Sequence, residues 1–157
     1  IGTVGSEEKA VLARAHGYTH VINYRTEDVL TRVLEITGGE KLRVVYDGVG
    51  RDTFEVSLDC LRPRGLMVSF GNASGAPAPL DLQILANKGS LFITRPTMLT
   101  YTASEAELQQ SSEDLFSRVV SGELMVEINQ RYALQDVQQA HRDLESRKTS
   151  GSTILVP

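Results

Sequence analysis

The sequence has few of the features that mark several common classes of protein. It contains no tryptophan and a single cysteine, Cys60, which excludes an internal disulfide and fits a reducing compartment such as the cytoplasm. No apolar run approaches the roughly 20 residues of a membrane span. The net charge is −4 without a long basic run, so neither nucleic acid nor an anionic membrane is expected as a partner.

Motifs for metal binding and covalent catalysis are missing as well. His16, His20, His141 and Cys60 show no spacing typical of metal ligands, so we expect no zinc site. No Gly-x-Ser-x-Gly motif is present, and Cys60 falls within a helical pattern as a small core residue. No side chain is therefore predicted to be catalytic, and no metal is expected.

The glycine-rich fingerprint of dinucleotide-binding folds, Gly-x-Gly-x-x-Gly, is also absent. The segment Gly48-Val49-Gly50 lacks the third glycine at the required spacing. The chain starts at Ile1, without methionine and directly in a strand-like pattern, which suggests a piece of a longer protein.

What the sequence does contain is a regular alternation of strand and helix patterns. The predicted strands cover 1–4, 20–24, 43–47, 66–70, 90–94, 127–132 and 152–156, and the predicted helices 7–15, 27–37, 52–61, 81–87, 105–121 and 137–144. Ser6, Thr26 and Ser104 are the expected N-caps of three of these helices. The alternation predicts an α/β fold with a doubly wound parallel sheet.

Such sheets bind ligands outside the carboxyl ends of their strands. The stretch 65–75 is the best candidate, because the apolar run Leu66–Phe70, typical of a strand covered on both faces, is followed by Gly71, Asn72 and Ala73. The alternative is a buried strand followed by an ordinary turn. Asp47 ends another predicted strand, where it could cap a helix or face a ligand.

The ends of the first two predicted strands favour NADPH over NADH. An NAD site carries an acidic residue that holds the ribose 2′-hydroxyl. Here the first strand ends in Gly5 and Ser6, Lys9 follows one helical turn later, and Tyr24 and Arg25 end the neighbouring strand. Small residues surrounded by cations suit a 2′-phosphate, although Lys9 alone could equally be a solvated helix lysine.

Several motifs in combination resemble the zinc-free quinone oxidoreductases of the medium-chain dehydrogenase/reductase superfamily. They are Ile-Asn-Tyr-Arg at 22–25, Val-Val-Tyr-Asp-Gly-Val-Gly at 44–50, Gly-Leu-Met-Val-Ser-Phe-Gly-Asn-Ala-Ser-Gly at 65–75, Ser-Leu-Phe-Ile-Thr-Arg-Pro at 90–96 and the ending at 145–157. The resemblance implies a Rossmann-like fold without its first strand and glycine-rich loop, that is, the C-terminal portion of such a protein. Residues 1–125 would be a partial nucleotide-binding domain, and 126–157, a helix and a strand, would return to a catalytic domain.

The resemblance also implies NADPH-dependent one- or two-electron reduction of quinones, with hydride passing directly from the nicotinamide to the acceptor. The implied cofactor-binding residues are Gly5, Ser6, Lys9, Tyr24, Gly50, Phe70, Gly71, Asn72, Ala73, Thr94, Arg95, Pro96 and Arg147. Arg147 could instead interact only with the C-terminus of the preceding helix. Because the glycine-rich fingerprint loop and the residues that would line the substrate pocket are missing, we expect no turnover from this chain alone.

Two further expectations concern the sheet edges. Without a central strand, the strands at 1–4 and 43–47 lose a common partner. We therefore expect that these edges pair differently, that they associate with another chain, or that the piece was cut from a longer protein. The apolar strand at 90–94 is expected to form the interface of a homodimer. The alternatives to a quinone reductase are a non-catalytic nucleotide-binding or dimerisation module and an enoyl or alkenal reductase of the same superfamily.

Overall fold

The computed structural model describes residues 1–146 and 149–157. The chain forms two compact units, Ile1–Thr100 and Tyr101–Pro157. The predicted division at 125 and 126 concerns the domains of a longer protein and stays a prediction.

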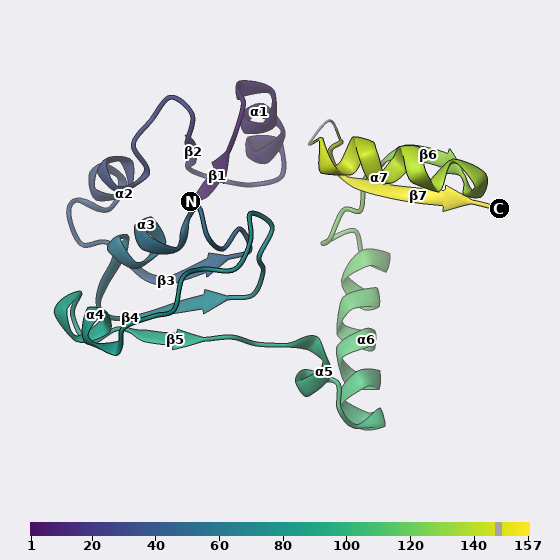
Figure 1. The fold of residues 1–157 in the computed structure, drawn as a ribbon. Helices are drawn as coiled ribbons and strands as arrows, with labels where there is room; N and C mark the ends of the chain where they lie inside the picture. Colours follow the sequence, from purple (N-terminus) through teal and green to yellow (C-terminus); the bar gives the residue numbers. More distant parts are fainter. Residues whose placement is uncertain (147–148) are drawn as a thin grey trace. The chain divides into compact units, whose positions relative to one another are not determined.

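The first unit alternates strands and helices, as the sequence pattern predicts (Figure 1). Its elements are β1 (Gly2–Val4), α1 (Glu7–Ala15), β2 (Val21–Asn23), α2 (Val29–Thr37), β3 (Leu42–Asp47), α3 (Phe54–Asp59), β4 (Leu61–Ser69), α4 (Leu82–Asn87), β5 (Phe92–Thr94) and α5 (Met98–Tyr101), the last of which extends one residue into the second unit. Every strand pair in this unit is parallel. The predicted α/β fold with parallel strands is therefore confirmed.

The strands of this unit form two sheets rather than one. β1 pairs with β2, and β4 lies between β3 and β5 in a three-stranded sheet. Within the described residues no ladder joins β1 to β3, so the two strands that were expected to lose a common partner do not pair with each other. Each leaves one edge without a strand neighbour.

The three-stranded sheet is held by a core around β4. Met67, at the centre of that strand, is fully buried and pairs in register with Val45 of β3 and Ile93 of β5. It packs with Leu58 of α3 and with Leu91 just before β5. Burial on both faces explains why this strand has an almost continuous apolar run.

A second core cluster links the two sheets through side chains instead of backbone hydrogen bonds. Ile22 of β2, Val33 of α2 and Cys60 after α3 are all buried and in contact. Burial raises the pKa of the Cys60 thiol to about 11, and the nearby Asp59 carboxylate adds to the increase. Cys60 is thus a core residue, as its position in the sequence predicts.

The helix ends follow the sequence with one exception. The Ser6 hydroxyl accepts from the Lys9 N–H at 3.3 Å, so the predicted N-cap of α1 is confirmed. The prediction that Thr26 caps α2 is wrong. Asp28 does so, because its carboxylate accepts the Thr31 N–H at 2.8 Å, whereas the Thr26 hydroxyl donates to the Asn23 carbonyl.

Two further boundaries differ from the prediction. β4 begins at Leu61, because Pro63 and Gly65 belong to the strand, and it ends at Ser69. Phe70 therefore lies beyond the strand, where its side chain is more than half exposed. The short helix α5 was not predicted from the sequence.

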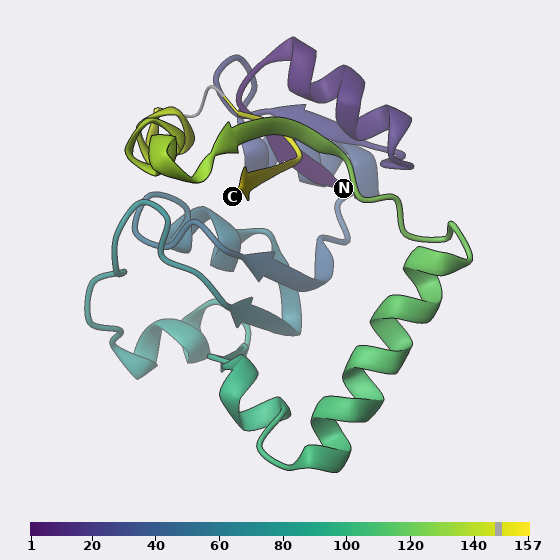
Figure 2. The ribbon, with the colours of Figure 1, turned by 90° about the vertical axis from the view of Figure 1, so that its right-hand side faces the viewer.

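The second unit contains a long helix and a small parallel sheet. Its elements are α6 (Glu105–Val120), β6 (Ile128–Ala133), the 3-10 helix η1 (Leu134–Asp136), α7 (Val137–Glu145) and β7 (Ser152–Val156). β6 and β7 pair in parallel, and α7 contacts β6 (Figure 2). No helix among the described residues is both long enough and apolar enough to cross a membrane.

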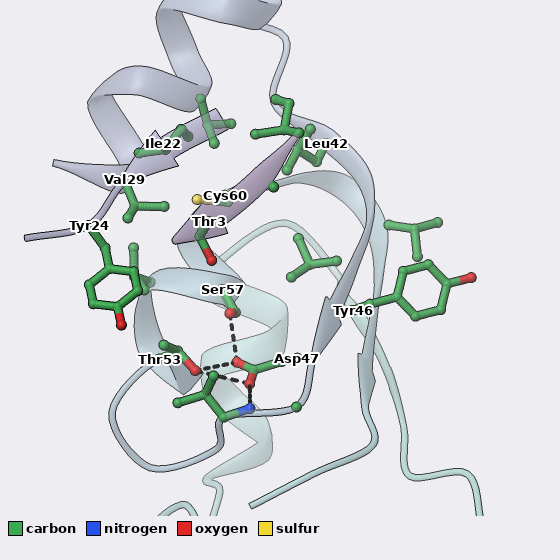
Figure 3. A pocket seen from close by; sticks show the side chains of 18 of the residues that line it. Thr3, Ile22, Tyr24, Val29, Leu42, Tyr46, Asp47, Thr53, Ser57 and Cys60 are labelled. Atoms are coloured by element: carbon green, nitrogen blue, oxygen red, sulfur yellow. Dashed lines mark hydrogen bonds between the residues drawn. The ribbon is translucent and has the colours of Figure 1, made fainter. Parts of the chain in front are cut away.

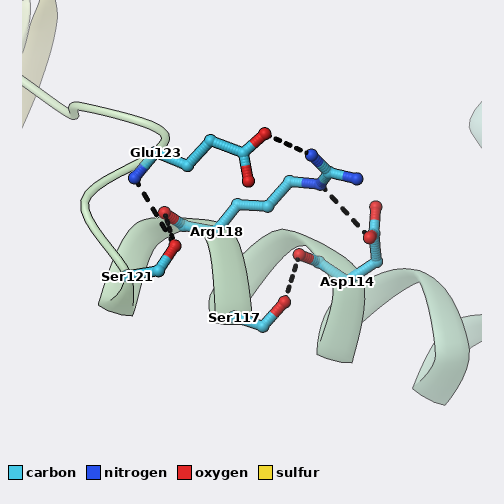
Figure 4. Close-up of polar contacts among 5 residues, drawn as sticks. All are labelled: Asp114, Ser117, Arg118, Ser121 and Glu123. Carbon is cyan, nitrogen blue, oxygen red and sulfur yellow. Dashed lines mark hydrogen bonds and ion pairs between the residues drawn. The ribbon is translucent and has the colours of Figure 1, made fainter.

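Both ends of α6 have local polar contacts. At the N-terminus, Ser104 and Glu107 form the predicted capping box. At the other end, the Arg118 guanidinium contacts Asp114 at 3.2 Å and Glu123 at 2.7 Å (Figure 4). Exposed ion pairs of this kind stabilise a helix only weakly. The capping box is therefore expected to stabilise α6 more than the Arg118 ion pairs do.

Candidate functional site

The site is built around the carboxylate of Asp47, the last residue of β3. Asp47 is buried, and its Oδ1 accepts the backbone N–H groups of Val49 at 2.8 Å and Gly50 at 2.9 Å. Thr53 donates its hydroxyl to both carboxylate oxygens, and the Ser57 hydroxyl donates to Oδ2 at 2.7 Å (Figure 3). The carboxylate thus shapes the turn after β3 and fixes it to the start of α3.

These contacts decide the charge state of Asp47. Burial alone would raise its pKa, but the hydrogen bonds from Gly50, Ser57, Thr53 and Val49 outweigh burial and lower it. The group is therefore ionised at neutral pH, and it accepts hydrogen bonds only. Asp47 does not cap α3, whose N-cap is Thr53, because its carboxylate accepts the amides of the preceding turn. That it faces a ligand stays a prediction.

The turn after β3 crosses the loop after β4 at very short range. The Phe70 and Gly71 N–H groups donate to the Asp47 carbonyl, and the Ala73 N–H donates to the Gly48 carbonyl. A Cβ on Gly71 would lie 2.4 Å from the Gly48 oxygen, and one on Gly48 would lie 2.9 Å from the Phe70 ring. The backbone overlap means that only glycine fits at position 71, whereas a side chain at position 48 would displace the exposed Phe70 ring.

Gly50 meets two requirements at once. Its φ of +88° lies in the left-handed region, and a Cβ there would be 2.5 Å from the Gly75 carbonyl oxygen. The Arg51 N–H donates to that same oxygen at 2.9 Å. The Ser74 hydroxyl adds a further link between the loops, since it donates to the Val49 carbonyl and accepts the Asp52 N–H.

Arg95 supports the loop after β4 from the neighbouring strand. Its Nη1 donates to the Ser69 carbonyl at 3.0 Å and to the Gly71 carbonyl at 3.2 Å, with Asn72 Oδ1 at 3.4 Å. The side chain thus holds backbone oxygens of the loop. This contact assigns Arg95 a positioning role that the sequence did not reveal.

At the other sheet, Gly5 and Tyr24 lie against each other. A Cβ on Gly5 would be 2.5 Å from the Tyr24 hydroxyl oxygen, so only glycine allows the ring to lie there. Ser6 and Lys9 follow in the first turn of α1, where the Ser6 side chain caps the Lys9 N–H. Gly5 and Tyr24 are thus in contact, whereas the binding role predicted for Gly5, Ser6, Lys9 and Tyr24 stays a prediction.

The predicted site residues thus fall into two groups within the first unit. The first group, at the ends of β1 and β2, is Gly5, Ser6, Lys9 and Tyr24; the second, at the ends of β3, β4 and β5, is Gly50, Phe70, Gly71, Asn72, Ala73, Thr94, Arg95 and Pro96. Arg147 lies outside the described residues. The assignment of these residues to a cofactor stays a prediction.

A cavity of about 450 Å³ lies between the strands that carry the two groups. Tyr24 lines it from the end of β2, and Gly48 and Val49 line it from the turn after β3. Thr3 of β1 and Tyr46 of β3 also line it (Figure 3). It lies beside the edges of β1 and β3 that pair with no strand in the described part of the chain.

Sequence reasoning missed the hydroxyl groups that build the site. Thr53 and Ser57 bind Asp47, and Ser74 joins the two loops. The signal available was a strand-ending Asp47 followed by Gly-Val-Gly and by hydroxyl residues on one face of the next helix. Among the residues that the structure describes, no three His, Cys, Asp or Glu side chains come together as a metal site could require.

Comparison with known proteins decides the family. The family model described as "Zinc-binding dehydrogenase" matches residues 16–155. The chain belongs to this family. The name describes the family as a whole and assigns no metal to this chain.

Particular members of the family are closely similar. The chain is 56% identical over 159 residues to a quinone oxidoreductase of Salmonella typhimurium, covering 100% of this chain and 49% of that protein. It superposes with a TM-score of 0.96 on the crystal structure of the Escherichia coli quinone oxidoreductase complexed with NADPH, at 54% identity, covering 99% of this chain and 48% of that one. These matches confirm the resemblance to quinone oxidoreductases and the Rossmann-like fold.

A relative with a different name is also similar. The 2-haloacrylate reductase of a Burkholderia species is 44% identical over 158 residues, covering 100% of this chain and 47% of that protein. The chain therefore spans about half the length of the curated relatives that it matches.

The buried carboxylate predicts an acid-sensitive stability. The lowered pKa of Asp47 means that its contribution is present above the unfolded-state pKa near 3.8 and is lost as pH falls through the lower folded-state value. Asp47→Asn should lose about 2 kcal/mol at neutral pH and show a shallower acid dependence than the wild type. Urea unfolding at neutral pH and at about pH 3 measures both effects. Asp52→Asn, an exposed carboxylate, is the control, and equal losses in the two variants would contradict the assignment.

The crossing loops predict that Gly50 is less replaceable than a glycine of the same conformation elsewhere. Gly39 has a φ of +89° and no atom within 4 Å of an added Cβ, whereas Gly50 faces the Gly75 oxygen at 2.5 Å. Gly39→Ala should cost about 1 kcal/mol for the left-handed backbone. Gly50→Ala should cost about 1–3 kcal/mol more, because of the added overlap. Chemical denaturation compares the two, and equal costs would show that the loops separate easily.

Proposed function

We propose that this chain supplies part of an NADPH site to a quinone-reducing enzyme of the zinc-binding dehydrogenase family. The observation that carries the proposal is the glycine-lined crossing of the loops after β3 and β4, at the carboxyl ends of parallel strands. Ligands of such sheets bind at these ends. The similarity to an E. coli quinone oxidoreductase whose structure contains NADPH supports the choice of cofactor and activity.

The first group of residues fits the adenosine 2′-phosphate. Gly5 and Ser6 follow the end of β1, and Tyr24 lies directly against Gly5. Lys9, one turn into α1, brings a positive charge to this position, and the segment contains no carboxylate where NAD sites carry one. In this proposal Lys9 binds the phosphate and Tyr24 forms a wall of its pocket.

The second group fits the nicotinamide end. The ring of Phe70 is 55% exposed at the crossing, beside Gly48. In this proposal Gly50, which adjoins Asn72 and Gly75, lies beneath the nicotinamide, and Asn72 and Ala73 continue the wall. Arg95 fixes the wall through its hydrogen bonds to the loop carbonyls. Thr94 and Pro96 flank it, and Arg147 remains a candidate phosphate contact.

Nicotinamide, when bound, supplies hydride for reduction of the acceptor. The residues of this chain orient the ring and exclude water from one side of it. The glycine fingerprint is absent from the sequence, so the opposite wall has to come from elsewhere. We infer that the chain alone gives no turnover.

A second candidate is reduction of an activated carbon–carbon double bond. The similarity to the Burkholderia 2-haloacrylate reductase favours it, because that relative covers the same length of the chain. Both candidates use the same cofactor-binding residues and differ in the acceptor.

We also propose a homodimer through β5. This strand lies at the edge of its sheet, and Phe92 on it is 61% exposed. An apolar edge strand without a neighbour is a natural template for pairing with a second copy.

The proposed preference for NADPH predicts that the chain binds NADPH more tightly than NADH. Calorimetric titration should give at least tenfold tighter binding of NADPH than of NADH, which corresponds to about 1.4 kcal/mol. Lys9→Gln should remove most of this difference, because it acts on the 2′-phosphate alone. Arg14→Gln, which removes a charge from the same helix, is the control. Equal affinity of the wild type for both cofactors would refute the role of Lys9 and Tyr24.

The dimer predicts a concentration-dependent mass. Light scattering after size-exclusion chromatography should show a dimer for the wild type and a monomer for Phe92→Lys, because the charge would be placed in the interface. Phe116→Lys alters a similarly exposed ring on α6 and should leave the dimer intact. If the Phe92→Lys variant dimerised with the same affinity as the wild type, β5 would be ruled out as the dimer interface.

A further inference from the structure

We propose that Glu27 and Arg32 set the preference for NADPH as positioning residues, without touching the cofactor. Glu27 fixes the loop after β2 that carries Tyr24, and Arg32 neutralises the Glu27 carboxylate, whose charge alone would repel a 2′-phosphate. Neither residue belongs to the two groups of candidate site residues. The inference deepens the proposed function and rests on it, because the ligand group concerned is the adenosine 2′-phosphate.

The loop after β2 is a compact turn organised around Asn23, the last residue of that strand. The Asn23 carbonyl accepts the Glu27 N–H at 2.9 Å, and its side-chain oxygen accepts the Arg25 N–H at 3.2 Å. The next residue, Tyr24, donates its N–H to the Val4 carbonyl at 3.1 Å. The turn and the position of Tyr24 at the end of β1 are therefore fixed together.

The carboxylate of Glu27 closes this turn. Its Oε2 accepts the Asn23 N–H at 2.8 Å, so Glu27 and Asn23 are joined by a reciprocal pair of hydrogen bonds. A hydrogen bond to a charged acceptor is about twice as strong as one between neutral groups. The side chain of Glu27 thus holds the residue that directly precedes Tyr24.

A carboxylate at this position works against binding of a phosphate. Glu27 is bonded to Asn23, and the neighbouring Tyr24 lies against Gly5 in the group proposed to bind the 2′-phosphate. Like charges repel over such distances, most strongly where water is partly excluded. NAD sites use an acidic side chain in this region to bind the ribose 2′-hydroxyl. An uncompensated Glu27 would therefore favour NADH.

Arg32, in the first half of α2, supplies the compensating charge. Its Nε lies 2.8 Å from Glu27 Oε1, while Glu27 Oε2 binds the loop amide. The side chains of Arg32 and Glu27 are 39% and 33% exposed, so the pair is partly shielded from water. The other carboxylate of the loop, Asp28, caps the N-terminus of α2, where the helix dipole offsets its charge.

The ion pair between Glu27 and Arg32 is not an ordinary pair along a helix surface. Glu27 precedes the first residue of α2, so the pair joins the loop to the helix. Arg32 also contacts Glu35, three residues further along α2, and that contact is the usual pair within a helix. Glu35 therefore provides a matched control, because its removal weakens a helix pair and leaves the loop pair in place.

The charges are tested by the ratio of the dissociation constants for NADH and NADPH, measured by calorimetry on the chain. Arg32→Gln should lower the preference for NADPH at least threefold, mainly by weakening NADPH binding, and the loss should shrink in about 0.5 M salt. The double variant Glu27→Gln, Arg32→Gln should recover the wild-type preference, because both charges are then absent. A merely structural pair would instead weaken both cofactors alike, and the double variant would not recover.

The controls remove similar charges elsewhere. Glu35→Gln breaks the helix pair, and Arg118→Gln removes an arginine that likewise contacts two carboxylates. Both should keep the preference within twofold of the wild type. A loss in either control as large as that in Arg32→Gln would overturn the assignment to the loop pair.

The positioning of the loop is measured without any cofactor. Amide hydrogen exchange of Asn23, followed by NMR, should be at least tenfold faster in Glu27→Ala than in the wild type. Glu27→Gln should stay close to the wild type, because its side-chain oxygen can accept the same N–H. Equal exchange in the wild type and Glu27→Ala would refute the positioning role of Glu27.

Failure of this inference is distinguishable from failure of the proposed function. A wild type that prefers NADPH, with Arg32→Gln keeping that preference, would leave the proposed function standing and refute the role of Arg32. A wild type without any preference would refute the 2′-phosphate site and the role of Arg32 with it. In that case the exchange of Asn23 still decides whether Glu27 positions the loop.

Discussion

Two backbone segments approach each other at the ends of β3 and β4 more closely than any side chain would permit, and the organisation of the site depends on this contact. The buried carboxylate of Asp47 makes it possible, because it gathers the amide groups of the following turn and binds the turn to α3. Gly71 then leaves the space that the crossing needs, because a Cβ there would overlap the Gly48 backbone. Arg95 secures the second loop from the next strand. The two loops are thus held by hydrogen bonds over short distances, and each of these bonds requires the side chain of one particular residue.

Most of the fold could be predicted from the sequence, because its strands and helices follow strong periodic patterns. The capping box at Ser104 and the N-cap at Ser6 were correct since they depend on neighbouring residues only. The errors arose where local signals compete. Asp28 outcompetes Thr26 as a cap, since its carboxylate reaches the free amide of Thr31. For the site, glycine spacing indicated the loops, but the hydroxyl groups of Thr53 and Ser57 could not be recognised before the helix had been placed against the strand.

The first unit is divided into two sheets because its strands are joined across the division by side-chain packing alone. Side-chain packing around Ile22, Val33 and Cys60 brings the sheets together, but packing is not directional and does not satisfy the backbone of β1 or β3. Hydrogen bonding requires a strand at a fixed spacing, and within the described part of the chain none is available. Among the described residues the two sheets are therefore joined by side-chain packing and not by a strand ladder.

The crossing also determines which main-chain groups of the loop after β4 remain available for a ligand. The amides of Phe70, Gly71, Ala73 and Ser74 all donate to carbonyls of the neighbouring turn, and Arg95 takes up the carbonyls of Ser69 and Gly71. An anion arriving here would find few main-chain donors, unlike at a helix N-terminus or a phosphate-binding turn. The loop also presents the exposed, uncharged ring of Phe70. If a ligand binds here as proposed, this loop would recognise its shape, and the charged parts of that ligand would be bound by other residues.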